Sequence, residues 1–514
     1  MHSSLRSLCL VVTLPWEFIR RVYRGGLNTR NIPAFAFNFA LNFCPVFIWL
    51  CVFKNADLIP TSWRPPIHNK AAFLADVFMF GDLAGELKAQ LGTNEGQLLT
   101  PLSWLAAALF ALLVCSLLPI SLWYYLYYCK RCQANVLDPY AHLFHRGYRF
   151  SPTNRRVLLP FLYLLLAFVG LNSVNLLAWQ RESNFNKFKD ILAWVSYVLL
   201  HLIAPILTAV YLYVFQPPGT LKAFSLAMGT QNICGVLTHL SLPMAPPWFI
   251  HMYGIRDTQH VSYEQDGYAA GLTRVDSHLG THLNSKGFHK SPIVFGAVPS
   301  LHSAMAVQCF LFLITRAAST KATLPLVVDP NTDSEETPVG PSPLMSSTTS
   351  KISDSALERG SSLDPDWSSE DIELDLLSRD SGDSKAFFTS STVTSTHPKF
   401  RYGTPVPVRA LNSKLLSIFH MALIPRFLGT MFPILQWWST MYLDHHFRFD
   451  LFIGLCYAVT SHLLVNAFYL QPRVLKKWCE IRMDTAPDTH KEAKTMGMRV
   501  FEDTDVEWFF DPFA

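Results

Sequence analysis

Charged residues are scarce in this sequence of 514 residues: they make up 16% of it, whereas about a quarter of a typical soluble protein is charged. Half of the residues are hydrophobic, and 38 are phenylalanine. A chain with so few charges and so much apolar surface is neither intrinsically disordered nor an ordinary cytosolic enzyme. We therefore expect an integral membrane protein with some soluble segments.

The sequence also lacks an organised cysteine pattern. Most of its ten cysteines lie within apolar runs, where cysteine behaves as a small hydrophobic residue. Cys129 and Cys132 form a CxxC pair, but no second pair completes a zinc site, which favours juxtamembrane thiols. No small-residue cleavage site follows the apolar residues 8–18, so we expect no signal peptide. These absences exclude a small secreted domain held by disulfides.

Long apolar runs dominate the chain instead. A helix that crosses a bilayer needs about 20 mostly apolar residues, and about eight segments meet this requirement. The predicted spans are 34–53, 104–128, 157–179, 191–215, 221–242, 299–315, 427–443 and 449–470. We expect an all-α integral membrane protein, a polytopic bundle of about eight transmembrane helices.

Basic residues between the predicted spans orient the bundle. Lysine and arginine gather in the segments 20–30, 130–156, 316–321 and 473–482. With this set of spans all four segments fall on one side, which the positive-inside rule identifies as the cytosol. The N-terminal segment 1–33 and the tail 471–514 are then cytosolic. The loop 243–298 and residues 444–448 lie on the opposite side.

A polar stretch divides the membrane domain into two parts, 34–316 and 411–470. Residues 317–410 are rich in serine and threonine, and between 331 and 385 there are 13 acidic residues against 4 basic ones. Such a composition buries too little apolar surface to fold alone, so we expect a disordered cytosolic loop. Both a passive linker and a phosphorylated or docking segment remain open.

Two polar groups interrupt the apolar pattern at the non-cytosolic side. Residues 295–303 (FGAVPSLHS) open the span 299–315, and residues 441–450 (MYLDHHFRFD) join the last two spans. Ionisable residues at membrane depth are functional candidates by default. Antiparallel helices would bring the two groups together at one membrane face.

The residue types in these two groups suit phosphoryl transfer. Ser300 and His302 begin a predicted helix, whose first N–H groups favour an anion such as phosphate. His446 and Asp450 share a helix face, so the carboxylate can fix the imidazole tautomer and leave the other nitrogen nucleophilic. His445 points elsewhere and is expected to be structural. A metal site at these histidines lacks a third ligand at a fixed spacing, so we expect no metal and no cofactor.

These motifs resemble those of the type 2 phosphatidic acid phosphatase (PAP2) superfamily. Pro299-Ser-Leu-His302 is similar to the PSxH motif of that superfamily, and His446-x3-Asp450 is similar to its final HxxxD motif. The bundle is therefore expected to have a PAP2-like core. A narrower resemblance, to the catalytic subunits of fungal inositol phosphorylceramide synthases, covers about half of the chain. It is carried by Arg64–Pro66, residues 190–242, Ala245–Trp248, Gly271–Asp276, Val294–Ser303 and Trp438–His446.

The resemblance implies transfer of phosphoinositol from phosphatidylinositol to ceramide, with release of diacylglycerol. His446, oriented by Asp450, would attack phosphorus and form a phosphohistidine, while His302 would act as the acid and then as the base. The resemblance also implies a Golgi membrane with the active site on the lumenal face. The implied partners are lipids and a small membrane regulatory subunit, with no nucleic acid.

Four residues are candidate ligands of the substrate phosphate. Ser300 lies at the helix start, and Arg64 opens the Arg-Pro-Pro sequence after the first span. Arg274 is the best candidate for a further cation, with Asp276 as its organiser. A purely structural ion pair in that loop is the open alternative.

Two other classes of function remain open. A lipid phosphate phosphatase would use the same histidine pair with water as the acceptor, although the Ser-Arg pair typical of those enzymes is replaced by Ser439-Thr440 here. A non-enzymatic transporter would distribute its polar residues along several spans instead of collecting them at one face. The spans at 104–179 and the loop 317–410 look like insertions relative to the fungal synthases.

Overall fold

The computed structural model describes residues 2–28, 30–80, 121, 164, 166–316, 404, 422–482, 486–489 and 491–512. Nearly all of the predicted span 104–128, the first part of the span 157–179 and nearly all of the loop 317–410 lie outside these residues. The chain divides into two compact units, and every described residue belongs to the unit formed by Met1–Pro325 and Phe400–Ala514. The other unit is Leu326–Lys399.

The described part of the chain is helical apart from two isolated β-bridges, which join His68 to Met244 and Met244 to Gly296. The longer helices are α1 (His2–Leu27), α2 (Ile32–Lys54), α3 (Ala71–Phe80), α11 (His201–Phe215), α12 (Thr220–Ser241), α16 (Leu301–Arg316), α20 (Leu423–Tyr442) and α21 (Arg448–Val465). The short helices are α9 (Leu176–Trp179), α10 (Lys187–Trp194), α13 (Pro247–Tyr253), α14 (Leu272–Leu279), α15 (Leu283–His289), α22 (Lys476–Arg482) and α23 (Met496–Val500).

Two of the long helices are extended by π-helical segments. The segment η7 (Val195–Leu200) joins α10 to α11, and η9 (Asn466–Leu475) joins α21 to α22. Short 3-10 turns complete the described structure at η1 (Ala56–Leu58), η2 (Thr61–Trp63), η6 (Glu182–Asn184) and η10 (Glu507–Phe510).

In the part of the chain that the structure describes, three helical segments are long and apolar enough to cross a membrane, by their length and composition. They are Ile32–Lys54, Lys187–Phe215 and Arg448–Arg482, and they contain the first, fourth and last predicted spans. The helices α12, α16 and α20 form where three further spans were predicted. The chain is therefore a multi-pass helical membrane protein, whereas the total of about eight spans stays a prediction.

Local signals in the sequence explain where these helices begin. The Asn31 side chain accepts the N–H of Ala34 at 2.8 Å and caps α2, and Asn186 caps α10 in the same way through Lys189. Such caps satisfy N–H groups that the first turn of a helix leaves without partners. Gly219, before α12, has a φ of 102°, a conformation that glycine adopts without strain.

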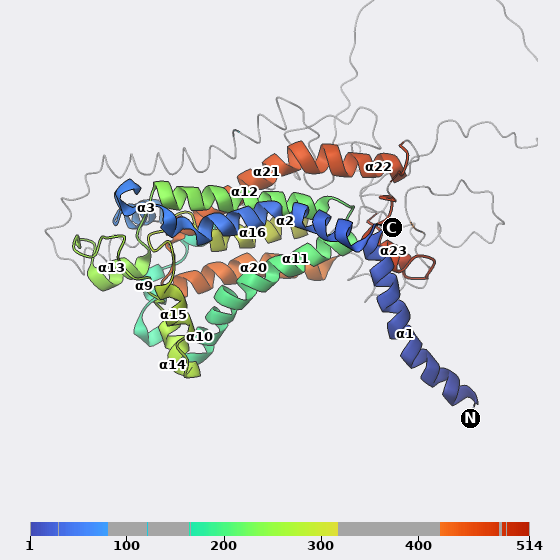
Figure 1. Cartoon of the computed structure of the whole chain (residues 1–514). Helices are drawn as coiled ribbons and strands as arrows, with labels where there is room; N and C mark the ends of the chain where they lie inside the picture. Colours follow the sequence, from blue (N-terminus) through green and yellow to red (C-terminus); the bar gives the residue numbers. More distant parts are fainter. Residues whose placement is uncertain are drawn as a thin grey trace, which may run out of the picture. The chain divides into compact units, whose positions relative to one another are not determined.

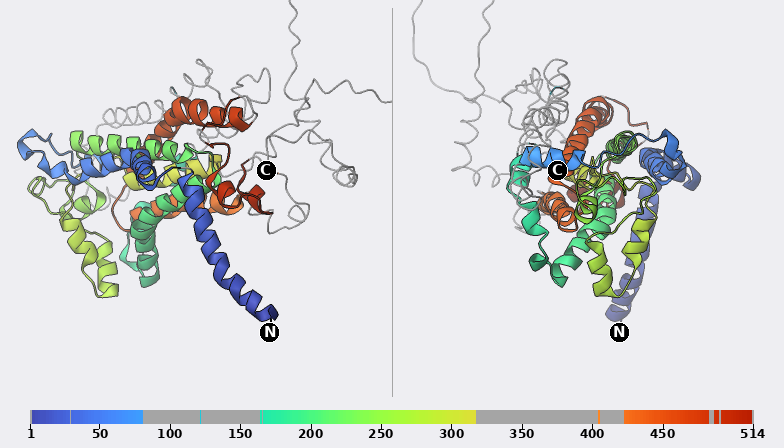
Figure 2. Two further views of the ribbon diagram at one scale, coloured as in Figure 1. Left: turned by 45° about the vertical axis from the view of Figure 1, so that its right-hand side comes forward. Right: turned by 90° about the vertical axis from the view of Figure 1, so that its left-hand side faces the viewer.

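The helix α16 lies at the centre of the described bundle. It packs against α11, α12, α20 and α21, while α2 packs on α12 and α3 packs on α21. Figures 1 and 2 show α2, α12 and α16 side by side, with α13, α14 and α15 at one end and α23 near the other. A β-carbon on Gly454 of α21 would collide with the carbonyl oxygen of Ser300, so only glycine permits this close contact with α16.

Candidate active site

The two polar groups meet where α16 and α21 begin. The N–H of Ser300 donates to the carbonyl of Asp450 at 3.0 Å, and the Ser303 hydroxyl donates to the carbonyl of Leu451 at 2.6 Å. The ring centroids of His302 and His446 are 5.6 Å apart. The fold thus brings together the two histidines that the motifs predicted would lie close.

His446 and Asp450 form a buried pair. The Nδ1 atom of His446 is 3.3 Å from Oδ2 of Asp450, and the same oxygen accepts the N–H of Phe447 at 2.9 Å. Because Phe447 immediately precedes α21, this second bond fixes the carboxylate in the first turn of the helix. The imidazole is thereby held in one orientation by a residue that cannot itself move freely.

Burial makes His446 a neutral base. It lowers the pKa of the imidazole to about 3, although a hydrogen bond with the backbone of Ala297 acts in the opposite direction. At neutral pH the ring therefore keeps a lone pair. A neutral imidazole beside a carboxylate is the state that nucleophilic attack requires.

Two residues that the sequence analysis did not single out hold His302. The Tyr197 ring stacks on His302 with centroids 4.3 Å apart, and His201 lies at the same distance in a tilted arrangement. Tyr197 also stacks on His445 at 4.8 Å, which agrees with a structural role for His445. Tyr197 belongs to the π-helical segment η7, and such segments recur at functional sites. His201 had a usable signal, because it is an ionisable residue within a predicted span.

Ser300 is buried and acts as a helix cap. Its hydroxyl oxygen accepts the N–H of Ser303 at 3.3 Å, and its carbonyl accepts the N–H of Ala304 at 3.0 Å. The preceding residue, Pro299, has its carbonyl 2.8 Å from Nε2 of His239. These contacts fix the start of α16, the helix that carries His302. A direct hydrogen bond from Ser300 to the substrate phosphate stays a prediction.

Arg274 is paired with Asp190 instead of Asp276. Both Nε and Nη2 of Arg274 lie 3.0 Å from Oδ1 of Asp190, and the guanidinium carbon is 3.7 Å from the centre of the Phe185 ring. The prediction that Asp276 organises Arg274 is therefore wrong. The physical reason is that residues two apart on α14 point to different sides of the helix.

Asp276 instead holds the connection between α14 and α15. Its carboxylate accepts hydrogen bonds from Thr281, Asn284 and Ser285 at 2.8 to 3.2 Å. Burial raises the pKa of Asp276, but the bonds from Ser285 and Asn284 outweigh that effect and keep the pKa below its ordinary value. Asp276 therefore shapes the loop that carries Arg274 without touching it.

Arg64 lies apart from the histidines. It donates to the carbonyls of Ile59 and Ala56 at 3.0 and 3.1 Å and lies 5.1 Å from the centre of the Tyr263 ring. It lines a cavity of about 180 Å³ that also includes His239 but neither of the paired histidines. Among the described residues, Arg64 is thus not brought to the site as a phosphate ligand.

A buried ion pair that the sequence analysis missed supports the first turn of α21. Nη2 of Arg448 is 2.8 Å from Oδ2 of Asp76, and neither side chain is exposed. Oδ1 of Asp76 also accepts the N–H of Phe449 at 2.9 Å, so α3 is tied to the turn that contains Asp450. The signal was present, because Arg448 is a charged residue inside the second polar group.

The fold and this site define a class of protein: a helical membrane protein in which two neighbouring histidines lie where two of its helices begin. Within the described residues, no group of three or more histidine, cysteine or acidic side chains is arranged to hold a metal ion. Comparison with known proteins agrees with this class. Residues 161–330 match the family model of the PAP2 superfamily.

Relatives narrow the class further. The chain is 48% identical to inositolphosphotransferase 1 of Saccharomyces cerevisiae, over 97% of this chain and 98% of that protein. It is 38% identical to the inositol phosphorylceramide synthase catalytic subunit of Schizosaccharomyces pombe, over 35% of this chain and 42% of that protein. It is 31% identical to the phosphoinositol dihydroceramide synthase of Bacteroides thetaiotaomicron, over 24% of this chain and 39% of that protein. No solved structure matches the chain.

The chain belongs to the family of inositolphosphotransferase 1, and it is a phosphoinositol transferase that contains a PAP2 superfamily match. The PAP2 match ends at residue 330, so it includes His302 but not His446. The full-length similarity to inositolphosphotransferase 1 extends the relationship over both histidines.

Proposed function

We propose that this enzyme moves phosphoinositol from phosphatidylinositol to a hydroxyl group of a sphingolipid and releases diacylglycerol. The observation that carries the proposal is the approach of His302 to His446, with Asp450 fixing the second ring. Catalysis of phosphoryl transfer depends mainly on positioning the reacting groups and stabilising the charge of the transition state. Two fixed imidazoles at a helix N-terminus supply both.

The reaction takes two displacements at phosphorus. In the first, the nitrogen of His446 that does not bond Asp450 attacks, a P–N bond forms, and the P–O bond to diacylglycerol breaks. His302 gives a proton to the departing oxygen, and the negative phosphate favours the protonated form of His302 while the donor is bound. In the second, His302 takes the proton from the acceptor hydroxyl, whose oxygen attacks phosphorus and breaks the P–N bond.

Arg274 is the proposed further cation for the phosphate. Its helix is joined to the histidine loop, because the N–H of Gly271 donates to the carbonyl of Leu443 at 3.0 Å. Burial raises the pKa of Asp444, two residues before His446, and the positive charge of Arg274 opposes that rise, so the guanidinium acts on the histidine loop. Asp190 would hold the guanidinium in place until the donor arrives.

The acceptor of the phosphoinositol group is a sphingolipid hydroxyl. The family resemblance points to ceramide, and the partial relatives are named for ceramide or dihydroceramide. A second candidate is a ceramide that already carries a polar head group. It is favoured by one observation: the relative that matches the whole chain is named for inositol phosphate transfer without mention of ceramide.

The first test replaces each histidine. We expect His446→Ala and His302→Ala each to abolish transfer, because one removes the nucleophile and the other removes the acid and base. Transfer is measured with fluorescent ceramide and phosphatidylinositol in membranes that contain equal amounts of each variant. His289→Ala is the matched control, since His289 is 57% exposed and pairs only loosely with Asp266, at 3.8 Å. Near-normal transfer by either active-site variant would contradict the proposal.

A second test identifies the product. Mass spectrometry of lipids formed in a ceramide-fed membrane should show a sphingolipid that has gained one phosphoinositol group. Gain on ceramide itself and gain on a ceramide with a head group give products of different mass. Release of free phosphate from phosphatidic acid, with no sphingolipid product, would instead favour the phosphatase alternative.

The cellular setting forms part of the same proposal. We propose a Golgi membrane with the histidines on the lumenal face, supported by the basic segments at the predicted cytosolic ends of the spans. A small membrane subunit is the proposed partner. Protease protection of an epitope inserted in the loop 243–298, in sealed Golgi vesicles, tests the orientation.

A further inference from the structure

A large groove extends along the bundle from Met305, three residues after His302, to the end of α12 that carries Lys222. Its volume is about 750 Å³, and its walls come from α2, α11 and α12, with Met305 of α16 beneath them. The wall residues include Phe39, Trp49, Val210 and Phe224, so most of the groove is apolar. Val210 is 54% exposed, which places an apolar side chain at the groove without protein packed over it.

One end of the groove is strongly basic. Arg30, Lys222, Arg473, Lys477 and Arg499 all line it, and Glu492 is the single acidic residue of the lining. Glu492 pairs with Lys477 at 2.8 Å. Within the described residues, no carboxylate lies within ion-pair distance of the other four. We call this group of five cations the basic rim.

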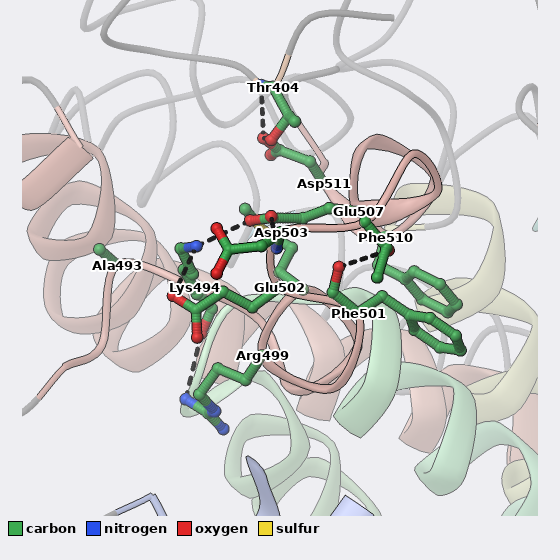
Figure 3. Close-up of polar contacts among 12 residues, drawn as sticks. Thr404, Ala493, Lys494, Arg499, Phe501, Glu502, Asp503, Glu507, Phe510 and Asp511 are labelled. Atoms are coloured by element: carbon green, nitrogen blue, oxygen red, sulfur yellow. Dashed lines mark hydrogen bonds and ion pairs between the residues drawn. The ribbon is translucent and has the colours of Figure 1, made fainter. Parts of the chain in front are cut away.

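The C-terminal tail builds part of the basic rim. Arg499 donates to the carbonyls of Gly25 and Lys494 at 3.0 and 3.1 Å, and Lys494 pairs with Glu502 and Glu507, both at 2.9 Å (Figure 3). Burial lowers the pKa of Arg499, and the positive charge of Arg30 lowers it further. Arg30 and Arg499 both line the groove, so an anion bound at this end would meet both positive charges.

The groove is distinct from the candidate active site. Lys222 and His239 lie at opposite ends of α12, and 17 residues of helix separate them by about 26 Å. That distance is close to the hydrocarbon thickness of a bilayer, about 30 Å. The basic rim and the histidines therefore face opposite membrane surfaces.

We infer that this groove binds one anionic glycerophospholipid, with its acyl chains along the apolar walls and its phosphate at the basic rim. The charge of the rim excludes a zwitterionic choline lipid as the preferred occupant, because a choline group would meet further cations. The apolar walls argue against a free inorganic anion as the occupant, because such an anion has no apolar surface to bury against them. The lipid stabilises the enzyme from the face opposite to the chemistry, and this goes beyond the proposed transfer reaction.

The test compares lipids that cannot serve as the phosphoinositol donor. The full-length enzyme is placed in nanodiscs of phosphatidylcholine alone or of phosphatidylcholine with phosphatidylserine, and lipids that stay bound are identified by native mass spectrometry. We expect one phosphatidylserine to be retained per chain and the melting temperature to rise. His446→Ala should retain the same lipid, which separates this site from the donor site.

Matched variants locate the site. Each cation near a lipid phosphate contributes about fivefold to affinity, so Lys222→Gln with Arg473→Gln should weaken retention about 30-fold. Val210→Trp, which fills the groove, should also prevent retention. Lys476→Gln is the control, because Lys476 is a neighbouring cation outside the lining that pairs with Glu480.

Three results would overturn the inference. One is equal retention of phosphatidylserine by the wild type and by both groove variants. Another is no difference in bound lipid or melting temperature between the two nanodisc compositions. Protection by inorganic phosphate alone would show that only the rim, and not the apolar groove, binds an anion, and would also contradict it.

Discussion

At the scale of single residues, the starts of α16 and α21 place His302 near His446, which Asp450 orients. His302, His446 and Asp450 could be found because their spacing and residue types are fixed by what phosphoryl transfer needs. Tyr197 and His201 could not be placed beside them from the sequence, because their contact with His302 depends on how η7 packs against α16. Arg274 was found, but its partner Asp190 is 84 residues away in the chain.

The neutral state of His446 predicts an unusual pH profile. His446 acts in its neutral form, and burial lowers its pKa from an ordinary value near 6.5 to about 3. We therefore expect kcat/KM to hold as the pH falls through 6.5 and to decline only as the pH approaches about 3, where His446 gains a proton. The measurement is transfer as a function of pH, with each sample also returned to neutral pH and assayed again to exclude irreversible unfolding. A decline centred near pH 6.5 would show that His446 titrates as an exposed histidine.

At the scale of helices, the apolar runs predicted the positions of α2, α11, α12, α16, α20 and α21. They could not reveal the π-helical segments, since one extra residue per turn leaves no clear mark on an apolar sequence. They also could not reveal the contact between α3 and α21, because Asp76 and Arg448 are 372 residues apart. The segment η7 places Tyr197 against His302, and the pair of Asp76 and Arg448 supports the first turn of α21.

The approach of α16 to α21 gives a prediction for Gly454. A β-carbon there would collide with the Ser300 carbonyl and lie 2.9 Å from the β-carbon of Ser303, so Gly454→Ala must push the two helices apart. We expect at least a tenfold loss of transfer, because misplacing reacting groups by about 1 Å can cost about 100-fold. Gly287→Ala is the control, since a β-carbon there meets no atom within 4 Å. Full activity of Gly454→Ala would mean that the helices can separate without harm.

The buried pair of Asp76 and Arg448 gives a prediction for stability. Asp76→Asn leaves a fully buried guanidinium without a counter-charge, which costs about 3–5 kcal/mol. The free energy of unfolding, measured in detergent by denaturant titration, should fall by that amount. Glu17→Gln should cost less than about 1 kcal/mol, because its ion pairs are exposed. Replacing both buried partners, as Asp76→Leu with Arg448→Met, should recover much of the loss.

At the scale of the whole molecule, composition predicted a multi-pass membrane protein, and the motif resemblance predicted the family and the type of enzyme. The lipid groove could not be predicted, because its lining comes from segments as far apart in the chain as Arg30, Val210 and Arg499. A groove of this kind leaves no local pattern in a sequence. It exists only after the helices have packed.

The division of the chain into two units predicts which part is dispensable for chemistry. Every residue of the candidate site belongs to the first unit, while Leu326–Lys399 forms the second. Replacing 326–399 with a Gly/Ser linker of equal length should therefore leave transfer by isolated membranes unchanged. A scrambled version of the same residues serves as the control for composition. Loss of transfer with the linker would assign this segment a part in the catalytic domain.

The contacts of Phe510 and Asp511 predict the effect of a truncating mutation. The carboxylate of Asp511 is 2.7 Å from Nη2 of Arg482 and accepts bonds from Thr404, while the carbonyl of Phe510 accepts the Thr495 hydroxyl (Figure 3). Removal of these residues would take the counter-charge from the largely buried Arg482 and leave Arg499 on an unsupported segment. A stop codon in place of Phe510 would thus be a loss-of-function allele, even though both histidines would still be translated.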